Sequence, residues 1–546
     1  MKKTIIFICA ALVYQVVAVA QDLDPTVEVS REYEGKMIEV HKPAIKMSVP
    51  DTLYQFDLGF DYSVFDNPYK GAYEFNPYVL EMKPTTSGDS GNVFYLRAGA
   101  GYTLHPALDL LWSPATPGTL GVDVYAMHRS YIGEYRGLQQ DAWNGYDLFS
   151  KAGADFACEW KKVALDFGAS YYGIHDKDYR RSRGYNALDA YMTVRSKTTW
   201  PENFTYDVSA SYRFAQDCSR TWVTGGLAGH EFNLDSHIRP AFGGVGRVVF
   251  DLGVEMDSYN GLLNSTAGCF RFVPRYVYKK GRLALDLGVR VSTVIASGEM
   301  NLTKGQDVYP DIRADLAVIP DAMKIYMRIG GGDRLNRYSS LVDANHHLDF
   351  SYGMSGASSL IDVSVERVSA VLGLEGRITS FFSYNIKGGY VNVKNGLLDA
   401  ALADEYGMFM PAVGYSPYQK CFAAIDWNMT LSSIRFIGNV EYTHSWGIES
   451  DYMLAPSPLK GEAAIEYDWM NRIDAGVDCQ FSLKRASGNG FTVPAYADLG
   501  VYAEYAMNRK LSFWLRGGNL LNMEIQRNLL YAEKGINFTA GICLTF

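Results

Sequence analysis

The sequence predicts an all-β protein, specifically a transmembrane antiparallel β-barrel of about 22 strands. Three observations predict it. The last ten residues form one extended strand of alternating character, and the chain stops on a phenylalanine. Similar alternation recurs from residue 53 onward. After residue 20, no run approaches the roughly 18 consecutive apolar residues that a transmembrane helix needs. A chain with apolar strand faces and no such helix can cross a bilayer as a closed barrel, in which every backbone group finds a partner.

The terminal strand presents one face to lipid and the other to the lumen. Asn537, Thr539, Gly541, Cys543 and Thr545 form the small or polar face. A terminal aromatic residue after such a strand is characteristic of outer-membrane barrels, whose assembly machinery recognises it. We therefore expect a barrel-assembly signal on the apolar face, formed by Phe538, Ile542, Leu544 and Phe546.

Residues 1–20 are expected to be a secretory signal peptide. Lys2 and Lys3 precede a short apolar run, and Ala18 and Ala20 provide small residues for cleavage. A membrane anchor is disfavoured because the run is short and Gln15 interrupts it. Residues 21–52 would then form a short periplasmic segment and residues 53–546 the barrel. This places the protein in the outer membrane of a Gram-negative bacterium.

Charge and cysteine content exclude several classes of function. The formal net charge is −9, and it becomes −11 after removal of the signal with its two lysines, which argues against a nucleic-acid partner. Six of the seven cysteines lie beyond the signal, and they are widely spaced without a CxxC pair. A disulfide framework or zinc site is therefore not expected. We expect no cofactor.

Alternating stretches define the strands in the middle of the chain. Clear examples, each of nine residues or more, lie at 163–171, 204–214, 283–291, 421–431 and 473–483. They exceed the five or six residues usual in soluble sheets and match strands that cross a bilayer at a tilt. Polar residues between the apolar ones would face the lumen. Mixed charges suit a wet or filled interior but identify no transported ion. The lumen candidates are Asp166, Asp286, Arg290, Asp311, Arg313, Lys324 and Arg328.

Short and long connections alternate, as expected for tight periplasmic turns and long outer loops. Counting strands backward from Phe546 places every short turn on the periplasmic side and gives 22 strands. The count falls to 18 or 20 if weak strands within 53–102 and 203–258 are not formed. The short turns are 159–162, 279–282, 319–322, 377–380, 432–434, 469–472 and 507–509. The long connections are 128–145, 175–186, 333–361, 393–418, 447–460 and 520–536.

The C-terminal residues resemble a known family. Leu-Ser-Phe-Trp-Leu-Arg-Gly-Gly-Asn-Leu-Leu-Asn at 511–522, followed by a loop and Gly-Ile-Asn-Phe at 535–538, is similar to the end of TonB-dependent receptor barrels. Those barrels close with a strand that runs into an Asn-Leu-Phe-Asn type corner, and they have 22 strands. The resemblance covers the last forty residues closely and the remaining barrel in architecture. It implies transport of solutes across the outer membrane.

One feature of the family is missing from the expected layout. Such receptors carry a plug domain of well over a hundred residues ahead of the barrel, whereas about thirty residues are expected there in this chain. Thr-Val-Glu-Val-Ser at 26–30 looks like the segment by which these receptors engage TonB, so coupling to TonB stays open. The alternative function is a plug-less structural or scaffold subunit with a surface lipoprotein or plugging partner. In either case we expect an occluded lumen, filled by a partner or by long loops such as 333–361 and 393–418, which could fold inward or instead clasp a surface lipoprotein.

Candidate catalytic and binding motifs have simpler explanations. Gly-Asp-Ser-Gly at 88–91 matches a serine-protease segment, but a Gly/Ser turn in a polar loop explains it better. His346 and His347 could hold a metal with Asp343 or Asp349, although adjacent side chains of an extended stretch diverge. We expect no enzymatic activity from the predicted rim residues His128, His175, Asp176 and His444. The cations of 175–186 could bind an anionic solute or lipopolysaccharide phosphates at the outer surface, but a solvated charged loop is the simpler explanation.

Overall fold

A computed structural model describes residues 93–546, apart from 103, 115–118, 137, 139–141, 178–181, 201, 219–225, 242–245, 300–301, 303–304, 321, 349–360 and 404–408. The expected signal peptide, the segment 21–52, the TonB-like segment, a first strand near residue 53 and the motif at 88–91 all lie outside these residues. No helix among the described residues is long and apolar enough to cross a membrane.

A single sheet of 22 strands forms the barrel, and a separate two-stranded hairpin accompanies it. The hairpin consists of β20 (Arg485–Ala486) and β21 (Thr492–Val493). The barrel strands are β1 (Val93–Tyr102), β2 (Ala107–Ser113), β3 (Leu120–Tyr135), β4 (Trp143–Glu159), β5 (Val163–Lys177), β6 (Ser182–Ser196), β7 (Thr205–Asp217), β8 (Leu227–Arg239), β9 (Gly246–Gly261), β10 (Ser265–Lys280), β11 (Leu283–Gly298), β12 (Gly305–Ile319), β13 (Met323–Leu335), β14 (Val363–Ile378), β15 (Phe382–Ala403), β16 (Phe409–Leu431), β17 (Ile434–Trp446), β18 (Leu459–Trp469), β19 (Ile473–Ser482), β22 (Tyr496–Asn508), β23 (Leu511–Gly518) and β24 (Asn537–Thr545).

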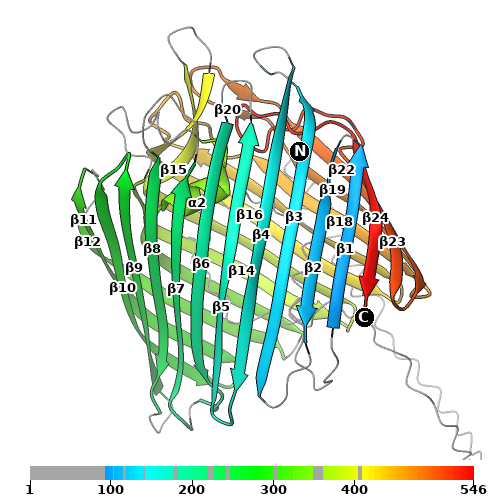
Figure 1. Cartoon of the computed structure of the whole chain (residues 1–546). Coiled ribbons are helices and arrows are strands. Elements are labelled where there is room, and N and C mark those ends of the chain that lie inside the picture. The colour runs from blue at the N-terminus through cyan, green and yellow to red at the C-terminus, as the bar shows by residue number, and fades with distance from the viewer. Residues whose placement is uncertain are drawn as a thin grey trace, which may run out of the picture. The chain divides into compact units, whose positions relative to one another are not determined.

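The barrel is closed by its first and last strands. Neighbouring strands pair antiparallel in chain order, with β19 next to β22, and β1 pairs with β24 from Tyr95 opposite Thr545 to Tyr102 opposite Phe538. The main chains of Phe94 and Phe546 also exchange two hydrogen bonds of 2.9 Å. Closure removes both sheet edges. The predicted 22-stranded antiparallel barrel is confirmed, and all 22 strands lie between Val93 and Thr545 (Figure 1).

The two ends of the barrel differ. All seven predicted short turns join strands at the end that holds Phe546, here called the turn end, and the opposite end is the loop end (Figure 1). Met470 and Asn471 adopt φ values of 55° and 53° in one such turn. Consecutive left-handed residues match the twist of a two-residue hairpin, and asparagine tolerates them well. Tight turns of this kind fix the strand register.

Side chains alternate between an apolar outer face and a polar inner face. On β11, Leu287 and Val289 are about half exposed on one face, whereas Arg290 and the fully buried Ser292 lie on the other. Strand pairing carries this alternation from one strand to the next. The exposed apolar side chains therefore form the band that contacts lipid in a membrane-spanning barrel.

Three of the predicted long connections are mostly strand, among them 128–145, where β3 and β4 pair as far as Tyr135 opposite Trp143. The stretch 393–418 forms the outer part of the β15–β16 hairpin, with pairing that continues from Val393 opposite Tyr418 to Ala403 opposite Phe409. The stretch 175–186 likewise continues β5 and β6, with Asp176 opposite Arg183. Beyond the apolar band, strands need no lipid-facing alternation, so their hydropathy pattern resembles that of a loop. The expectation that 393–418 folds inward as a loop is wrong.

Candidate functional site

A segment of the β13–β14 connection lies inside the barrel. Residues 336–348, here called the luminal segment, contain α2 (Tyr338–Ala344). The buried cluster that includes this helix draws side chains from Ile174 on β5 round to Leu397 on β15. A helix can pack against strands so far apart around a closed barrel only from its interior. The expectation that loop 333–361 folds inward is met by its described residues.

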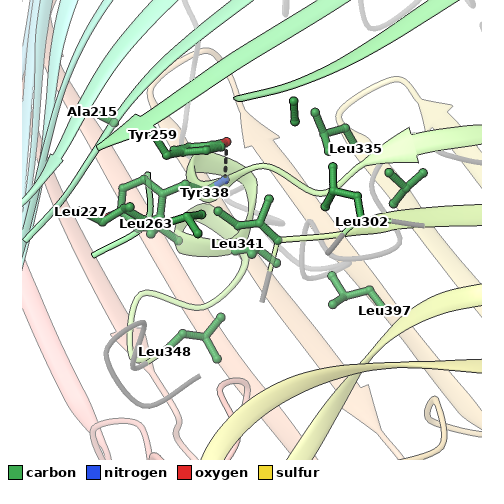
Figure 2. Packing of buried hydrophobic residues seen from close by; sticks show 14 of the residues in the cluster. Ala215, Leu227, Tyr259, Leu263, Leu302, Leu335, Tyr338, Leu341, Leu348 and Leu397 are labelled. Atoms are coloured by element: carbon green, nitrogen blue, oxygen red, sulfur yellow. Dashed lines mark hydrogen bonds between the residues drawn. The ribbon is translucent and has the colours of Figure 1, made fainter. Parts of the chain in front are cut away.

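Apolar packing holds α2 in place. Tyr338 and Leu341 are 1% exposed, and Figure 2 shows them beside Leu227, Tyr259 and Leu263 near the ends of β8 and β9. Burial of a large apolar side chain contributes about 1.5–3 kcal/mol. An isolated helix of seven residues is not stable in water. The helix therefore depends on its contacts with the barrel wall.

Two acidic side chains of the wall hold the start of the helix. The Ser339 N–H donates to Glu231 of β8 at 3.0 Å, and the Ser339 hydroxyl donates to the same carboxylate. Arg337 pairs with Asp257 of β9 at 3.1 Å. The Tyr259 hydroxyl accepts the Tyr338 N–H at 3.3 Å (Figure 2). All of these residues are at most 8% exposed, so water competes little for their hydrogen bonds. Glu231 thus accepts one of the first helix N–H groups, for which Arg337, the N-cap residue, provides no side-chain acceptor.

A second cluster holds the end of the luminal segment. Asp176 receives two hydrogen bonds of 2.9 and 3.0 Å from Arg183 Nε. His347 Nδ1 lies 2.9 Å from Asp176 Oδ2 and 2.8 Å from Arg183 Nη2. Tyr531, from the β23–β24 connection, stacks on the His347 ring at 3.9 Å between centroids. Arg183 fits neither the solvated loop nor the lipopolysaccharide contact considered for 175–186, because its side chain is 5% exposed and binds Asp176.

The two histidines of the segment have opposite pKa shifts. Burial and the neighbouring His346 lower the pKa of His347 to about 4. Burial also disfavours the charged form of His346, but the Asp147 carboxylate, 3.5 Å away, outweighs it and raises the pKa of His346. The predicted metal partner Asp343 pairs instead with Arg213 at 3.2 Å, and Asp349 is not among the described residues. Within the described part of the chain, no group of three or more His, Cys, Asp or Glu residues could hold a metal.

Five of the seven lumen candidates lie in two ion-pair clusters, here together called the network on β11–β14. Asp311 contacts Arg313 at 3.2 Å and Arg290 at 3.9 Å. Asp315 contacts Arg328 at 2.7 Å and Lys324 at 3.9 Å, and Lys324 also contacts Glu375 at 2.6 Å. These ion pairs neutralise the charges on the inner wall and link neighbouring strands.

The other two lumen candidates lie next to basic side chains of adjacent strands. Asp286 lies directly opposite Arg313 in the strand register. Asp166 lies apart from the network and pairs with Arg195 of β6. Like the network on β11–β14, these neighbours place charges of opposite sign side by side on the inner wall.

The predicted rim histidines do not form a catalytic set in the described residues. His128 contacts Ser150 at 2.8 Å, and His175 contacts Asn186 at 3.1 Å, each across its own hairpin. His444 lies beside Trp446. Sequence reasoning missed Glu231, the acid that holds the helix. Its inward position on an alternating strand could have been noticed, but its partner at position 339 could not.

Comparisons with known proteins identify the fold. No family model matches the chain, and no curated protein matches it by sequence. The structure is similar to the siderophore receptor PirA from Acinetobacter baumannii, with a TM-score of 0.60 and 11% identity over 83% of this chain and 80% of that chain. It is also similar to the copper transporter OprC (TM-score 0.63, 10% identity, 84% and 80% covered) and to the FrpB iron transporter from Neisseria meningitidis (0.62, 9%, 84% and 82%). The resemblance to TonB-dependent receptors is confirmed for the barrel fold.

Proposed function

We propose that this chain is an outer-membrane barrel that takes part in solute transport, and that the luminal segment obstructs its lumen at rest. The loop end would face the cell exterior and the turn end the periplasm. The observation that carries the proposal is the anchoring of 336–348 to strands far apart around the barrel. Similarity to barrels that are named as a siderophore receptor, a copper transporter and an iron transporter also supports a role in transport. Coupling to TonB stays a prediction.

Neutralised charges on the wall favour a gated pathway over a charge-selective pore. Acidic and basic side chains alternate along β11–β14 and bind one another. A wide pore selects ions through unpaired charges at a constriction. We therefore propose that the luminal segment controls passage, and not the ion pairs of the wall.

Single-channel conductance in a planar bilayer tests the proposal. Replacement of residues 338–347 by a short Gly/Ser linker should produce steady openings that the intact chain lacks, because the obstruction is gone. A matched control shortens the turn 487–490 between β20 and β21, which lies outside the barrel sheet. If the intact chain conducts as well as the linker variant, the luminal segment is not the obstruction.

A structural or scaffold role is the second candidate, and the outer loops favour it. Ala401, Leu454, Val493 and Leu529 come from four different connections or strands and form one buried cluster above the barrel. The outer loops that this buried cluster holds together would present a fixed surface to a lipoprotein. If the linker variant stays closed and a co-purifying lipoprotein is lost when this cluster is disrupted, the scaffold function replaces transport.

A further inference from the structure

The β23–β24 connection, residues 519–536 and here called the C-terminal outer loop, has a fixed internal structure. The Asn519 side chain donates to the carbonyls of Met523 at 2.9 Å and Lys534 at 3.2 Å, and it accepts the Met523 N–H at 3.0 Å. Arg527 binds Asp498 of β22 at 2.6 Å. A loop tied down in this way places its remaining side chains precisely, although it carries no regular secondary structure.

Tyr531 is the residue of this loop that contacts the luminal segment. Its ring lies nearly parallel to that of His347, at 13°. Its hydroxyl accepts a hydrogen bond of 2.8 Å from Arg183 Nη1, and Arg183 Nη1 also donates to the His347 carbonyl at 3.1 Å. The guanidinium carbon of Arg183 lies 5.0 Å from the centre of the tyrosine ring. Tyr531 thus contacts the end of the segment directly and also through an arginine.

Another residue of the same loop contacts the outer loops. Leu529, two residues before Tyr531, is 4% exposed and packs in the cluster of Ala401 from β15, Leu454 from the β17–β18 connection and Val493 from β21. Ala401 lies in the part of β15 that extends beyond Val393. One short stretch of chain therefore contacts both the outer loops and the luminal segment.

We infer that Tyr531 is a positioning residue that holds the luminal segment inside the barrel, and that the C-terminal outer loop couples this segment to the outer loops. A molecule that displaces the outer cluster would shift Leu529, withdraw Tyr531 from His347 and loosen the segment. The inference rests on the proposed role of the segment as the obstruction. It adds that a ligand would trigger opening by binding at the outer loops.

Hydrogen–deuterium exchange of the folded, full-length barrel tests the inference. In Tyr531→Ala, the amides of 338–345 should exchange about tenfold faster or more, because a ring contact and a bond to a charged group are lost. Tyr531→Phe keeps the ring and should show a smaller increase. Leu521→Ala, at an exposed position of the same loop, is the matched control. Unchanged exchange of 338–345 in Tyr531→Ala would overturn the inference.

Coupling must also act in the reverse direction, because linkage is reciprocal. His347→Ala should accelerate exchange within residues 523–533, while β8 amides stay as in the unmodified chain. A residue that merely stabilised its own loop would show no such response, so the absence of this effect would also overturn the inference. Exchange reports on how firmly the segment is held and not on solute passage. Failure here is therefore distinguishable from failure of the conductance test.

Discussion

Truncation of Glu231 should release the start of the luminal segment. The carboxylate is 3% exposed and accepts both the N–H and the hydroxyl of Ser339. A hydrogen bond to a charged acceptor contributes about 1.5–3 kcal/mol, and a buried N–H without a partner costs about 1–3 kcal/mol. Relief of repulsion with Asp257, which shares the Tyr259 hydroxyl, offsets about 1 kcal/mol. The closed state of Glu231→Ala should therefore lose about 1.5–5 kcal/mol relative to the open state.

This loss predicts a large change in channel behaviour. At about 1.4 kcal/mol per factor of ten, the ratio of open to closed time should rise about 10- to 4,000-fold in single-channel recordings. Asp235→Ala is the matched control, since Asp235 is an acid on the same strand and face and pairs with Arg271 of β10 at 3.7 Å. If both variants open equally often, Glu231 does not hold the segment and the reasoning fails.

Three further predictions concern pH, lipid contact and assembly. Burial and His346 hold the pKa of His347 at about 4 in the closed state, below the usual value of about 6.5. Between these two pH values the closed state therefore binds fewer protons than the released state. Channel opening should therefore increase as pH falls from about 7 to about 5. His347→Asn should remove this increase. The variant should then show only the opposite pH dependence of His346, whose raised pKa favours the closed state in acid. Leu287→Arg, on the lipid face, should lower the free energy of unfolding in vesicles by about 2–4 kcal/mol if residue 287 lies near the bilayer midplane. Asp286→Asn, on the inner face, should have a smaller effect, and an equal effect would contradict the assigned faces. Phe546→Ala should reduce the amount of barrel assembled in cells while refolded protein loses only about 0.5–1.5 kcal/mol, and normal assembly would exclude a terminal signal.

Local sequence patterns predicted the barrel because each strand carries its own evidence. The lipid face of β24 and the turn at Met470 and Asn471 are readable from a few adjacent residues. The interior could not be predicted in this way. Glu231 and Ser339 are 108 positions apart and meet only because the closed wall curves back on an inward segment. The outer part of hairpin β15–β16 was predicted to be a loop for a related reason. It extends beyond the lipid, so its residues need not alternate between apolar and polar.

Pairing of β1 with β24 has a consequence for how the chain folds. Arg97 lies opposite Cys543, so the contact that closes the barrel joins positions more than four hundred residues apart. Contacts of such sequence separation slow folding, because the entropy of a long loop is lost before the pairing forms. The other strand pairs are local hairpins that can form in chain order. Closure is thus expected to be the late, slow step, and until it occurs two strands expose unpaired edges that invite aggregation.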